Sequence, residues 1–413
     1  MAEIIVIGGG AGGMMAAIYA AMNGAQVTLL ERNEKLGKKI YITGKGRCNV
    51  TNDCDQDEFL KQVPRNPRFL YSAMSHFSPQ DMMALLEGAG CPVVVQRGRR
   101  VFPSTEKASD VTRALTRLLQ QYGVRVMLNA RVETVLTTDG AVSGVKLHDG
   151  REMQADAVIL ATGGVSYPMT GSTGDGYRIA EQLGHRIVKP VPALSALETE
   201  ESWCGALQGL SLRNVTLSVK KGKKVLWQEL GEMLFTHFGV SGPLVLEASS
   251  HLPEEPAGSE MFINLKPGLD AQQLDARMTR EFSAQSRKQL RNVLPALLPG
   301  KMAEIFADIC GVDGNKTCDQ ITRAEREKLC GMMQALPVTV KRFRSIDEAI
   351  VTRGGITVKE VAPATMESKL MPGVYFAGEV LDLDAHTGGY NLQIAWSTGA
   401  LAGQSAAQKQ FME

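Results

Sequence analysis

The hydrophobic pattern at the start of the chain predicts a strand, a helix and a second strand in quick succession. Residues 4–7 (IIVI) are a continuous run of β-branched side chains, as expected of a parallel strand that is buried on both faces. A glycine-rich turn follows, residues 14–23 continue from it as a helix, and residues 26–30 (QVTLL) predict the second strand. This order is typical of an α/β fold.

Short apolar strands that run into turns of small residues return at residues 156–164 (DAVILATGG) and 373–379 (GVYFAGE). Between them the pattern changes. Residues 189–192 (KPVP) break the α/β pattern, residues 211–227 alternate like strands of a small antiparallel sheet or barrel, and residues 270–333 are predicted to be helical. The Leu336-Pro337 pair marks the predicted return to the first domain.

Length and composition restrict the class of protein. A chain of 413 residues predicts more than one domain, and 44% hydrophobic with 22% charged residues is the balance of a soluble globular protein. With 45 basic against 44 acidic residues, net charge predicts no general attraction to nucleic acid or anionic lipid. No apolar stretch reaches the roughly 18 to 20 residues of a membrane span, and seven cysteines without a CxxC pair indicate reduced thiols rather than a metal site. We therefore expect a cytoplasmic protein with no metal and no membrane association.

The glycine-rich turn matches the G-x-G-x-x-G fingerprint of dinucleotide-binding folds. Gly8 permits the tight turn, Gly10 lets the backbone approach a pyrophosphate, and Gly13 allows the helix to pack closely on the strand. The positive end of the helix dipole would hold the diphosphate. Glu31 ends the second strand, where a carboxylate accepts hydrogen bonds from ribose hydroxyls and repels an NADP 2'-phosphate. The fingerprint does not separate NAD from FAD.

Longer motifs resemble those of FAD-binding two-domain flavoproteins, and of one family among them. Residues 156–164 resemble the ATG segment of these proteins, and residues 373–379 resemble their C-terminal flavin segment, with Glu379 where many relatives carry Asp. Residues 37–52 (GKKIYITGKGRCNVTN) resemble the signature of the HI0933-like flavoproteins. Four further blocks agree, at residues 98–103 (GRRVFP), 171–176 (GSTGDG), 234–243 (LFTHFGVSGP) and 387–393 (TGGYNLQ). The resemblance covers nearly the whole chain.

This resemblance implies an α/β protein with a Rossmann-like FAD-binding domain of the glutathione reductase type, an inserted β-barrel-like subdomain and a small helical subdomain. Residues 1–190 and 337–413 are expected to form the discontinuous FAD-binding domain, residues 191–268 the inserted β-rich subdomain, and residues 269–336 the helical subdomain. FAD is the expected cofactor, with Glu379 accepting hydrogen bonds from its ribityl chain. Because the sequence has no second G-x-G-x-x-G, a second dinucleotide domain is not expected.

Most of the residues expected to contact FAD lie in these motifs, and Val132 is expected to contact it as well. The amides at the start of the helix predicted from about Tyr390 would face the flavin and stabilise its anionic reduced form. The full set of expected cofactor ligands is Gly8, Gly10, Ala11, Gly12, Gly13, Glu31, Arg32, Lys39, Gly44, Arg47, Cys48, Asn49, Val132, Ala161, Thr162, Gly163, Gly378, Glu379, Gly389, Tyr390, Asn391 and Leu392.

Flavin chemistry also needs groups that donate to the substrate and manage a proton. The candidates are Arg47, Cys48, His237, His386 and Tyr390. Three of them have an ordinary structural alternative: Cys48 can simply pack, His237 can buttress the residues that follow it, and Tyr390 can form an aromatic wall. Asp382 and Asp384 are interpreted as solvated or helix-capping acids, and basic clusters at residues 97–100, 220–224 and 341–344 as solvated turns or as contacts for a phosphate backbone.

The leading hypothesis for function is an oxidoreductase in which reduced FAD gives hydride to an activated C=C bond, with NAD(P)H as the transient reductant. The family resemblance points to a uridine in 23S ribosomal RNA, giving dihydrouridine, or to a small enone such as a 3-dehydro-bile acid. One alternative is a flavin amine oxidase of the aminoacetone oxidase type. Another is a flavin-bound RNA or assembly factor without turnover. The sequence leaves the oligomeric state open.

Overall fold

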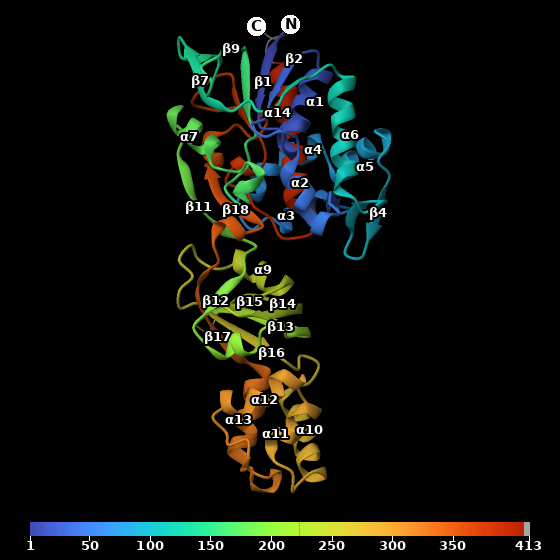
Figure 1. Ribbon diagram of the computed structural model, residues 1–413, viewed down its shortest axis with the longest axis vertical. Helices are drawn as coiled ribbons and strands as arrows, with labels where there is room; N and C mark the ends of the chain where they lie inside the picture. Colours follow the sequence, from blue (N-terminus) through green and yellow to red (C-terminus); the bar gives the residue numbers. More distant parts are fainter. Residues whose placement is uncertain (223, 409–413) are drawn as a thin grey trace. The chain divides into compact units, whose positions relative to one another are not determined.

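The computed structural model describes residues 1–222 and 224–408. The chain divides into two compact units, the first formed by Met1–Ala193 with Ile346–Glu413 and the second by Leu194–Ser345 (Figure 1). Each unit has a hydrophobic core of its own, so the second is an insertion that carries its own packing. Among the described residues, no helix combines the length and the apolar character that a membrane span requires.

A five-stranded parallel sheet forms the centre of the first unit. Its order is β19 (Val374–Phe376), β10 (Ala157–Leu160), β1 (Glu3–Ile7), β2 (Gln26–Leu30) and β6 (Arg125–Met127). The last four residues of β1 are buried because strands flank it on both sides and α1 (Ala11–Met22) packs on the sheet. Parallel strands bring their carboxyl ends to one edge, where ligands of open α/β sheets bind. The segments after residues 7, 30, 160 and 376 therefore meet there.

The helices α1 and α14 (Tyr390–Gln408) join the two ends of the chain. They lie against each other beside the central sheet (Figure 1). A Cβ on Gly399 would come within 2.3 Å of the Gly12 carbonyl oxygen, and one on Gly403 within 2.2 Å of the Ala16 carbonyl oxygen. Only glycine permits this backbone approach, so the last helix fixes the position of the helix that follows the glycine-rich turn.

The remaining elements of the first unit surround this sheet. Three small antiparallel sheets have the strand orders β3-β5-β4, β7-β8-β9 and β11-β18. Their strands are β3 (Thr51–Asn52), β4 (Val93–Gln96), β5 (Arg100–Pro103), β7 (Val132–Thr138), β8 (Ala141–Leu147), β9 (Glu152–Gln154), β11 (Ile187–Ala193) and β18 (Val351–Ile356), and the helices are α2 (Lys38–Ile42), α3 (Gln56–Lys61), α4 (Tyr71–His76), α5 (Pro79–Gly88), α6 (Ala108–Gln121) and α7 (Asp175–Gln182).

A closed six-stranded barrel and a group of helices form the second unit. The barrel order is β12 (Leu197–Thr199), β15 (Gly239–Ser241), β14 (Lys224–Thr236), β13 (Ser211–Lys221), β16 (Glu260–Asn264) and β17 (Leu336–Phe343). The helices are α8 (Trp203–Ala206), α9 (Pro243–Ser250), α10 (Ala271–Ala284), α11 (Leu290–Val293), α12 (Gly300–Ile309) and α13 (Arg323–Gln334), the last of which contacts β16 and β17. The predicted Rossmann-like α/β fold with an inserted barrel is confirmed.

Two features differ from what the proline-containing segments predicted. Residues 189–192, expected to break the α/β pattern, lie in β11, which pairs with β18 across a register shift between Val188 and Val191. Residues 337–343, expected in the first domain, belong to β17 and close the barrel against β12 and β16. The alternate side chains Leu336, Val338 and Val340 face the barrel core, so period-two burial outweighs the missing amide of one proline.

Candidate functional site

The glycines of the turn at the end of β1 have two different roles. Two of them are required by close contacts within the protein, and the third leaves space for a ligand. Gly8 has φ +104°, and a Cβ there would lie 2.5 Å from the Ala161 carbonyl oxygen. A Cβ on Gly13 would lie 1.8 Å from the Gly8 carbonyl oxygen, so both positions must be glycine for the chain to fold. Gly10 has an ordinary φ of −84°, and a Cβ there would meet no protein atom within 4 Å. Its missing side chain leaves space at the start of α1, which supports the predicted approach of a pyrophosphate.

Glu31, at the end of β2, is held in one orientation beside this turn. Its side chain accepts hydrogen bonds from the Gly9 amide at 2.7 Å, the Asn33 amide at 2.7 Å and the Asn33 side chain at 2.8 Å. The residue is 7% exposed. Because a carboxylate offers about four acceptor positions, one remains for a ribose hydroxyl. The geometry fits the predicted role of Glu31.

Arg32 follows Glu31 and belongs to a charged cluster. Its guanidinium bonds to Thr173 and lies 3.0 Å from Asp175, which Arg131 also holds with two hydrogen bonds of 2.9 and 2.8 Å. Burial by itself would raise the pKa of Asp175, but the hydrogen bonds from Arg131 and the charges of Arg131, Arg32 and Arg178 lower it below its usual value. Val132, the next residue after Arg131, is buried and begins β7. Asp175 thus joins Arg32, which follows Glu31, to Arg131. Val132 is placed near Glu31 because it follows Arg131 in the chain.

The loop at residues 43–50 takes several strained turns. Gly44, Lys45 and Cys48 all have positive φ values, and a Cβ on Gly44 would lie 2.9 Å from the Asn49 amide nitrogen. The side-chain oxygen of Asn49 is buried and has no hydrogen-bond partner among the described residues. Thr162, in the turn after β10, has a buried hydroxyl that also finds no partner there. Buried polar atoms are normally paired, so these two indicate a polar ligand.

Arg47 and Cys48 differ sharply in accessibility. The Arg47 guanidinium lies 4.5 Å from the centre of the Phe102 ring and 3.0 Å from Glu106, and its side chain is 41% exposed. Cys48 is fully buried, and burial raises the pKa of its thiol to about 12. The thiol therefore stays protonated and enclosed, which favours the packing interpretation of Cys48 over proton transfer.

Lys39 and Glu379 form an ion pair between α2 and the segment after β19. The Lys39 ammonium lies 2.6 Å from one Glu379 oxygen and 2.7 Å from the Ser166 hydroxyl. The other Glu379 oxygen accepts from the Thr352 amide at 2.8 Å. Glutamate reaches these groups because its side chain is one methylene longer than aspartate. Ser166 and Thr352 were not predicted, because a single hydroxyl residue far along the chain carries no sequence motif.

The other predicted ligands of this edge are small residues that shape its backbone. Ala161 donates its amide to the Ile7 carbonyl at 2.9 Å, and Gly163 has φ +74°. Gly378 has φ +76° and donates its amide to the Thr398 hydroxyl at 2.9 Å. Ala11 and Gly12 are the first two residues of α1.

The loop before α14 is braced from within and from the N-terminal half of the chain. Gly389 has φ +100°, and a Cβ there would lie 2.4 Å from the Thr51 carbonyl oxygen. The Asn391 side chain bonds to the Ala385 amide at 2.9 Å and to its carbonyl at 2.7 Å. The rings of Tyr390 and Phe59 meet edge to face with centroids 5.2 Å apart, and Leu392 packs against the core.

His386 lies in this loop and is half-buried. Its amide donates to the Gln62 carbonyl at 3.0 Å, and its Nδ1 lies 3.2 Å from Gln62 Oε1. Asp384, two residues earlier, is 1% exposed and lies 2.5 Å from Arg65. The interpretation of Asp384 as a solvated acid was therefore wrong, because the guanidinium from a remote segment compensates its buried charge. Gln62 and Arg65 were missed because no local pattern marks them.

His237 lies in the second unit, in the turn between β14 and β15. Its ring is exposed and meets Phe238 edge to face at 5.0 Å. The other candidate catalytic residues lie in the first unit. The basic cluster at residues 220–224 is also in the second unit, where Lys220 lies over the Phe262 ring and Lys223 falls outside the described residues.

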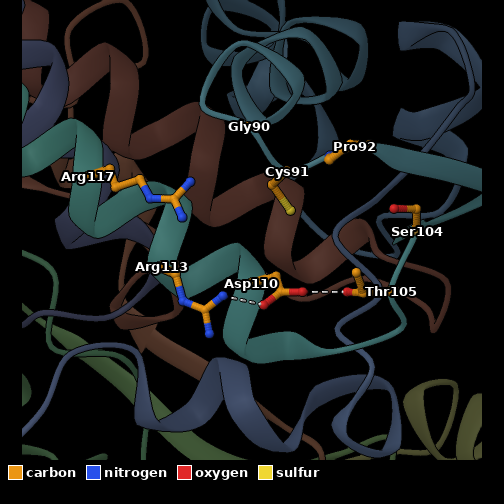
Figure 2. A pocket seen from close by; sticks show the side chains of 8 residues that line it. All are labelled: Gly90, Cys91, Pro92, Ser104, Thr105, Asp110, Arg113 and Arg117. Atoms are coloured by element: carbon orange, nitrogen blue, oxygen red, sulfur yellow. Dashed lines mark hydrogen bonds and ion pairs between the residues drawn. The ribbon is translucent and has the colours of Figure 1, made fainter.

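A cavity of about 120 Å³ lies in the first unit between α6 and the segments that flank β4 and β5. Figure 2 shows Asp110 between Arg113, at 2.9 Å, and the Thr105 hydroxyl, at 2.6 Å. The cavity contains none of the predicted cofactor ligands. It is therefore separate from the predicted flavin site.

The residues at the carboxyl edge of the central sheet fit FAD. Open space at Gly10, a spare acceptor on Glu31 and the unpartnered oxygens of Asn49 and Thr162 are the kinds of group that a dinucleotide with a polar ring satisfies. The contact of each residue with FAD stays a prediction. Among the described residues, no three His, Cys, Asp or Glu side chains come together in a way that would hold a metal ion.

Comparison with known proteins agrees with this assignment. Residues 2–405 match the family described as HI0933-like protein Rossmann domain. The chain is 31% identical to a 3-dehydro-bile acid delta(4,6)-reductase of Clostridium scindens, over 99% of this chain and 100% of the relative. It is also 31% identical to a ribosomal RNA dihydrouridine synthase of Haemophilus influenzae, over 96% of each chain.

A solved quinol-fumarate reductase has the same fold, with a TM-score of 0.53 at 17% identity over 98% of this chain and 71% of that chain. The family match spans far more than half of the sequence. The chain therefore belongs to the HI0933-like family of FAD-binding oxidoreductases.

Proposed function

We propose that this chain is a reductase that adds hydrogen across a C=C bond conjugated to a carbonyl, and that its substrate is a uridine in ribosomal RNA. The observation that carries the proposal is the full-length similarity to two relatives whose names describe such reductions, one on a bile acid and one on ribosomal RNA. A dienone and a uracil ring are both conjugated carbonyl systems, so one arrangement of side chains serves both.

FAD, once reduced by NAD(P)H, supplies the hydride for such a reaction. The protein must hold the cofactor, stabilise the charge that develops on the substrate carbonyl, and deliver a proton to the second carbon. Glu31 and the amides at the start of α1 would hold the ribose and the pyrophosphate. Arg47 would face the carbonyl oxygen, where a cation lowers the barrier. His386 is the proton donor in this proposal, because histidine is the side chain that most often transfers a proton in catalysis near neutral pH.

An exposed turn in the first unit favours RNA over a steroid. Arg97 and Arg99 are exposed between β4 and β5, and Arg100, which is also exposed, begins β5. Asn52 donates hydrogen bonds of 3.1 Å to the Gly98 carbonyl in this turn and of 3.1 Å to the Gly388 carbonyl in the loop before α14. The turn is therefore tied to the loop expected to face the flavin.

The charges of this turn are only partly compensated. Arg99 pairs with Glu58, whereas Arg97 and Arg100 have no ion-pair partner among the described residues. Phosphate contacts of this kind give RNA affinity that falls with salt. Catalysis on ribosomal RNA would also place the enzyme in the cytoplasm.

The test is mass spectrometry of ribosomal RNA from a strain that lacks the gene. We expect loss of dihydrouridine and its return when the gene is restored. In parallel, purified protein with NADH or NADPH receives either a 23S ribosomal RNA fragment or a 3-dehydro-bile acid. If the protein reduces only the bile acid, and dihydrouridine is unchanged in the strain that lacks the gene, the substrate is an enone and not ribosomal RNA.

The same preparation distinguishes the other two functions. Bleaching of the 450 nm flavin band by aminoacetone without oxygen would identify an amine oxidase. A flavin that neither nicotinamide nucleotides nor the amine reduces would identify a binding protein without turnover. We expect bleaching by NADH or NADPH alone.

A further inference from the structure

A short segment after α3 holds the loop that contains His386. Gln62 contacts His386 twice, through its carbonyl and through its side chain. Arg65 lies 2.5 Å from Asp384, and Asn66 donates to the Asp382 carbonyl at 3.0 Å. More than 300 residues of sequence separate the two segments, so these contacts arise from the fold and not from local geometry.

The contact to the imidazole ring has a definite chemical consequence. A glutamine oxygen only accepts hydrogen bonds, so the ring nitrogen that faces it must carry a hydrogen. In neutral histidine, one ring nitrogen carries the hydrogen and the other is bare. A proton on Nδ1 therefore leaves Nε2 as the atom that gains and loses a proton.

We propose that Gln62 is a positioning residue that holds His386 with its hydrogen on Nδ1 and thereby makes Nε2 the site of proton exchange. The proposal deepens the function above and rests on it for the role of His386. In the reduction, hydride goes to one carbon of the C=C bond, Nε2–H of charged His386 gives its proton to the other, and the N–H bond electrons stay on Nε2. Neutral His386 keeps its Nδ1–H bond to Gln62 and regains a proton from water.

The charges around His386 match this role. Asp382 and Asp384 lie on its own segment, Arg65 lies on the facing segment, and Tyr390 begins α14. Arg65 compensates Asp384. Burial raises the pKa of Asp382, an effect that the charge of Arg65 opposes. The ring contacts the neutral amide of Gln62, and a neutral acceptor favours imidazolium less than a carboxylate would.

The direct test is nuclear magnetic resonance of the FAD-loaded full chain with ¹⁵N-labelled histidine. Six histidines make the spectrum tractable, and His386→Gln identifies the signal of His386. We expect neutral His386 to carry its hydrogen on Nδ1. Gln62→Glu should raise its pKa by at least one unit, because a charged acceptor favours imidazolium. Gln62→Leu should move the hydrogen to Nε2 in part of the molecules.

Gln80 offers a matched control on α5, because it is exposed and its amide donates to Asp53 at 3.1 Å. Gln80→Leu should leave the His386 signal unchanged. Retained flavin absorbance and melting temperature show that each variant folds. Wild-type His386 with its hydrogen on Nε2, or a His386 signal that is the same in Gln62→Leu and Gln62→Glu, would overturn the proposal.

Single-turnover reduction of a 23S ribosomal RNA fragment separates this proposal from the one it rests on. Gln62→Glu should move the alkaline limb of the rate profile upward by the shift seen in the spectrum. In multiple-turnover assays with NAD(P)H, Gln62→Leu should lower kcat at least tenfold and leave KM within twofold. If His386→Gln reacts at the wild-type rate, the proton role of His386 falls. If that variant is inactive but Gln62→Leu reacts normally, the positioning role alone falls.

Discussion

At the scale of single residues, a substitution at Gly10 tests cofactor binding without disturbing the fold. A side chain there meets no protein atom within 4 Å, so Gly10→Val should fold with nearly the wild-type melting temperature of the flavin-free chain. It should bind FAD at least tenfold more weakly, because the isopropyl group fills space that the pyrophosphate needs. Flavin absorbance after desalting measures the loss.

Gly88, the last residue of α5, provides the control for Gly10. It is exposed, and a Cβ there also meets nothing within 4 Å. Gly88→Val should keep its FAD. A Gly10→Val protein that stays yellow would place the pyrophosphate elsewhere.

His185 predicts how stability depends on pH. Its side chain is fully enclosed, with Nε2 2.8 Å from the Ser368 hydroxyl and the Phe376 ring at 4.8 Å. Burial lowers its pKa, although Glu360 at 3.3 Å opposes this. The unfolded chain therefore binds a proton more readily, and the free energy of unfolding should fall as pH drops below about 6.5.

His185→Gln should reduce this pH dependence while keeping a hydrogen-bonding side chain. Urea unfolding at pH 7.5 and 5.5 gives the comparison. His76, whose pKa burial also lowers, should account for part of what remains. An unchanged difference between the two pH values in His185→Gln would contradict the prediction.

At the residue scale, sequence allows a prediction where spacing carries the information. The glycines and Glu31 are close in sequence and their chemistry follows from their order. Thr352, Gln62 and Arg65 could not be predicted in the same way. Each is a single polar residue whose partner, such as Glu379, His386 or Asp384, is placed beside it only by the complete fold.

At the scale of elements, the contact between α1 and α14 makes a sharp prediction for glycine. In Gly403→Ala the new methyl group would lie 2.2 Å from the Ala16 carbonyl oxygen, so the two helices must move apart. We expect a loss of about 1–3 kcal/mol in the free energy of unfolding. Gly331, an exposed residue near the C-terminal end of α13, has no atom within 4 Å of an added Cβ.

Gly331→Ala should therefore stabilise the protein by roughly 0.5–1 kcal/mol, since alanine is the better helix former. Denaturant unfolding followed by circular dichroism measures both variants. We therefore expect Gly403→Ala to lower the free energy of unfolding and Gly331→Ala to raise it. A neutral Gly403→Ala would show that α14 does not need this approach.

Elements were predictable from sequence when burial is continuous or strictly periodic. β1, β2, β10 and β19 were found because buried parallel strands are uninterrupted apolar runs. β11 and β17 were not, because both contain proline and their partners are remote. Val191 pairs with Arg353, and Pro337 pairs with Phe262. In the sequence, a proline predicts the end of a strand. In the fold, a strand that contains proline can still pair with a remote strand through its other amides.

At the scale of the whole molecule, the chain leaves the first unit and returns to it at neighbouring places. Ala193, the last residue of β11, pairs with Val351, the first residue of β18, in an antiparallel register. The two hydrophobic cores share no residue. All expected FAD ligands lie in the first unit, and His237 lies in the second. We therefore expect cofactor binding and the contribution of the inserted unit to be separable by experiment.

Replacing Leu194–Ser345 by a short Gly-Ser linker should give a protein that folds and binds FAD within about tenfold of the full chain, since β11 and β18 already bring the cut ends together. It should lose reduction of a 23S ribosomal RNA fragment if the inserted unit helps to bind RNA. Flavin absorbance and single-turnover assays measure the two properties, and Gly10→Val in the same shortened chain serves as the flavin-free control. A shortened protein that folds without binding FAD would show that the second unit is needed for the cofactor, and one with wild-type reduction would show that the first unit carries the whole reaction.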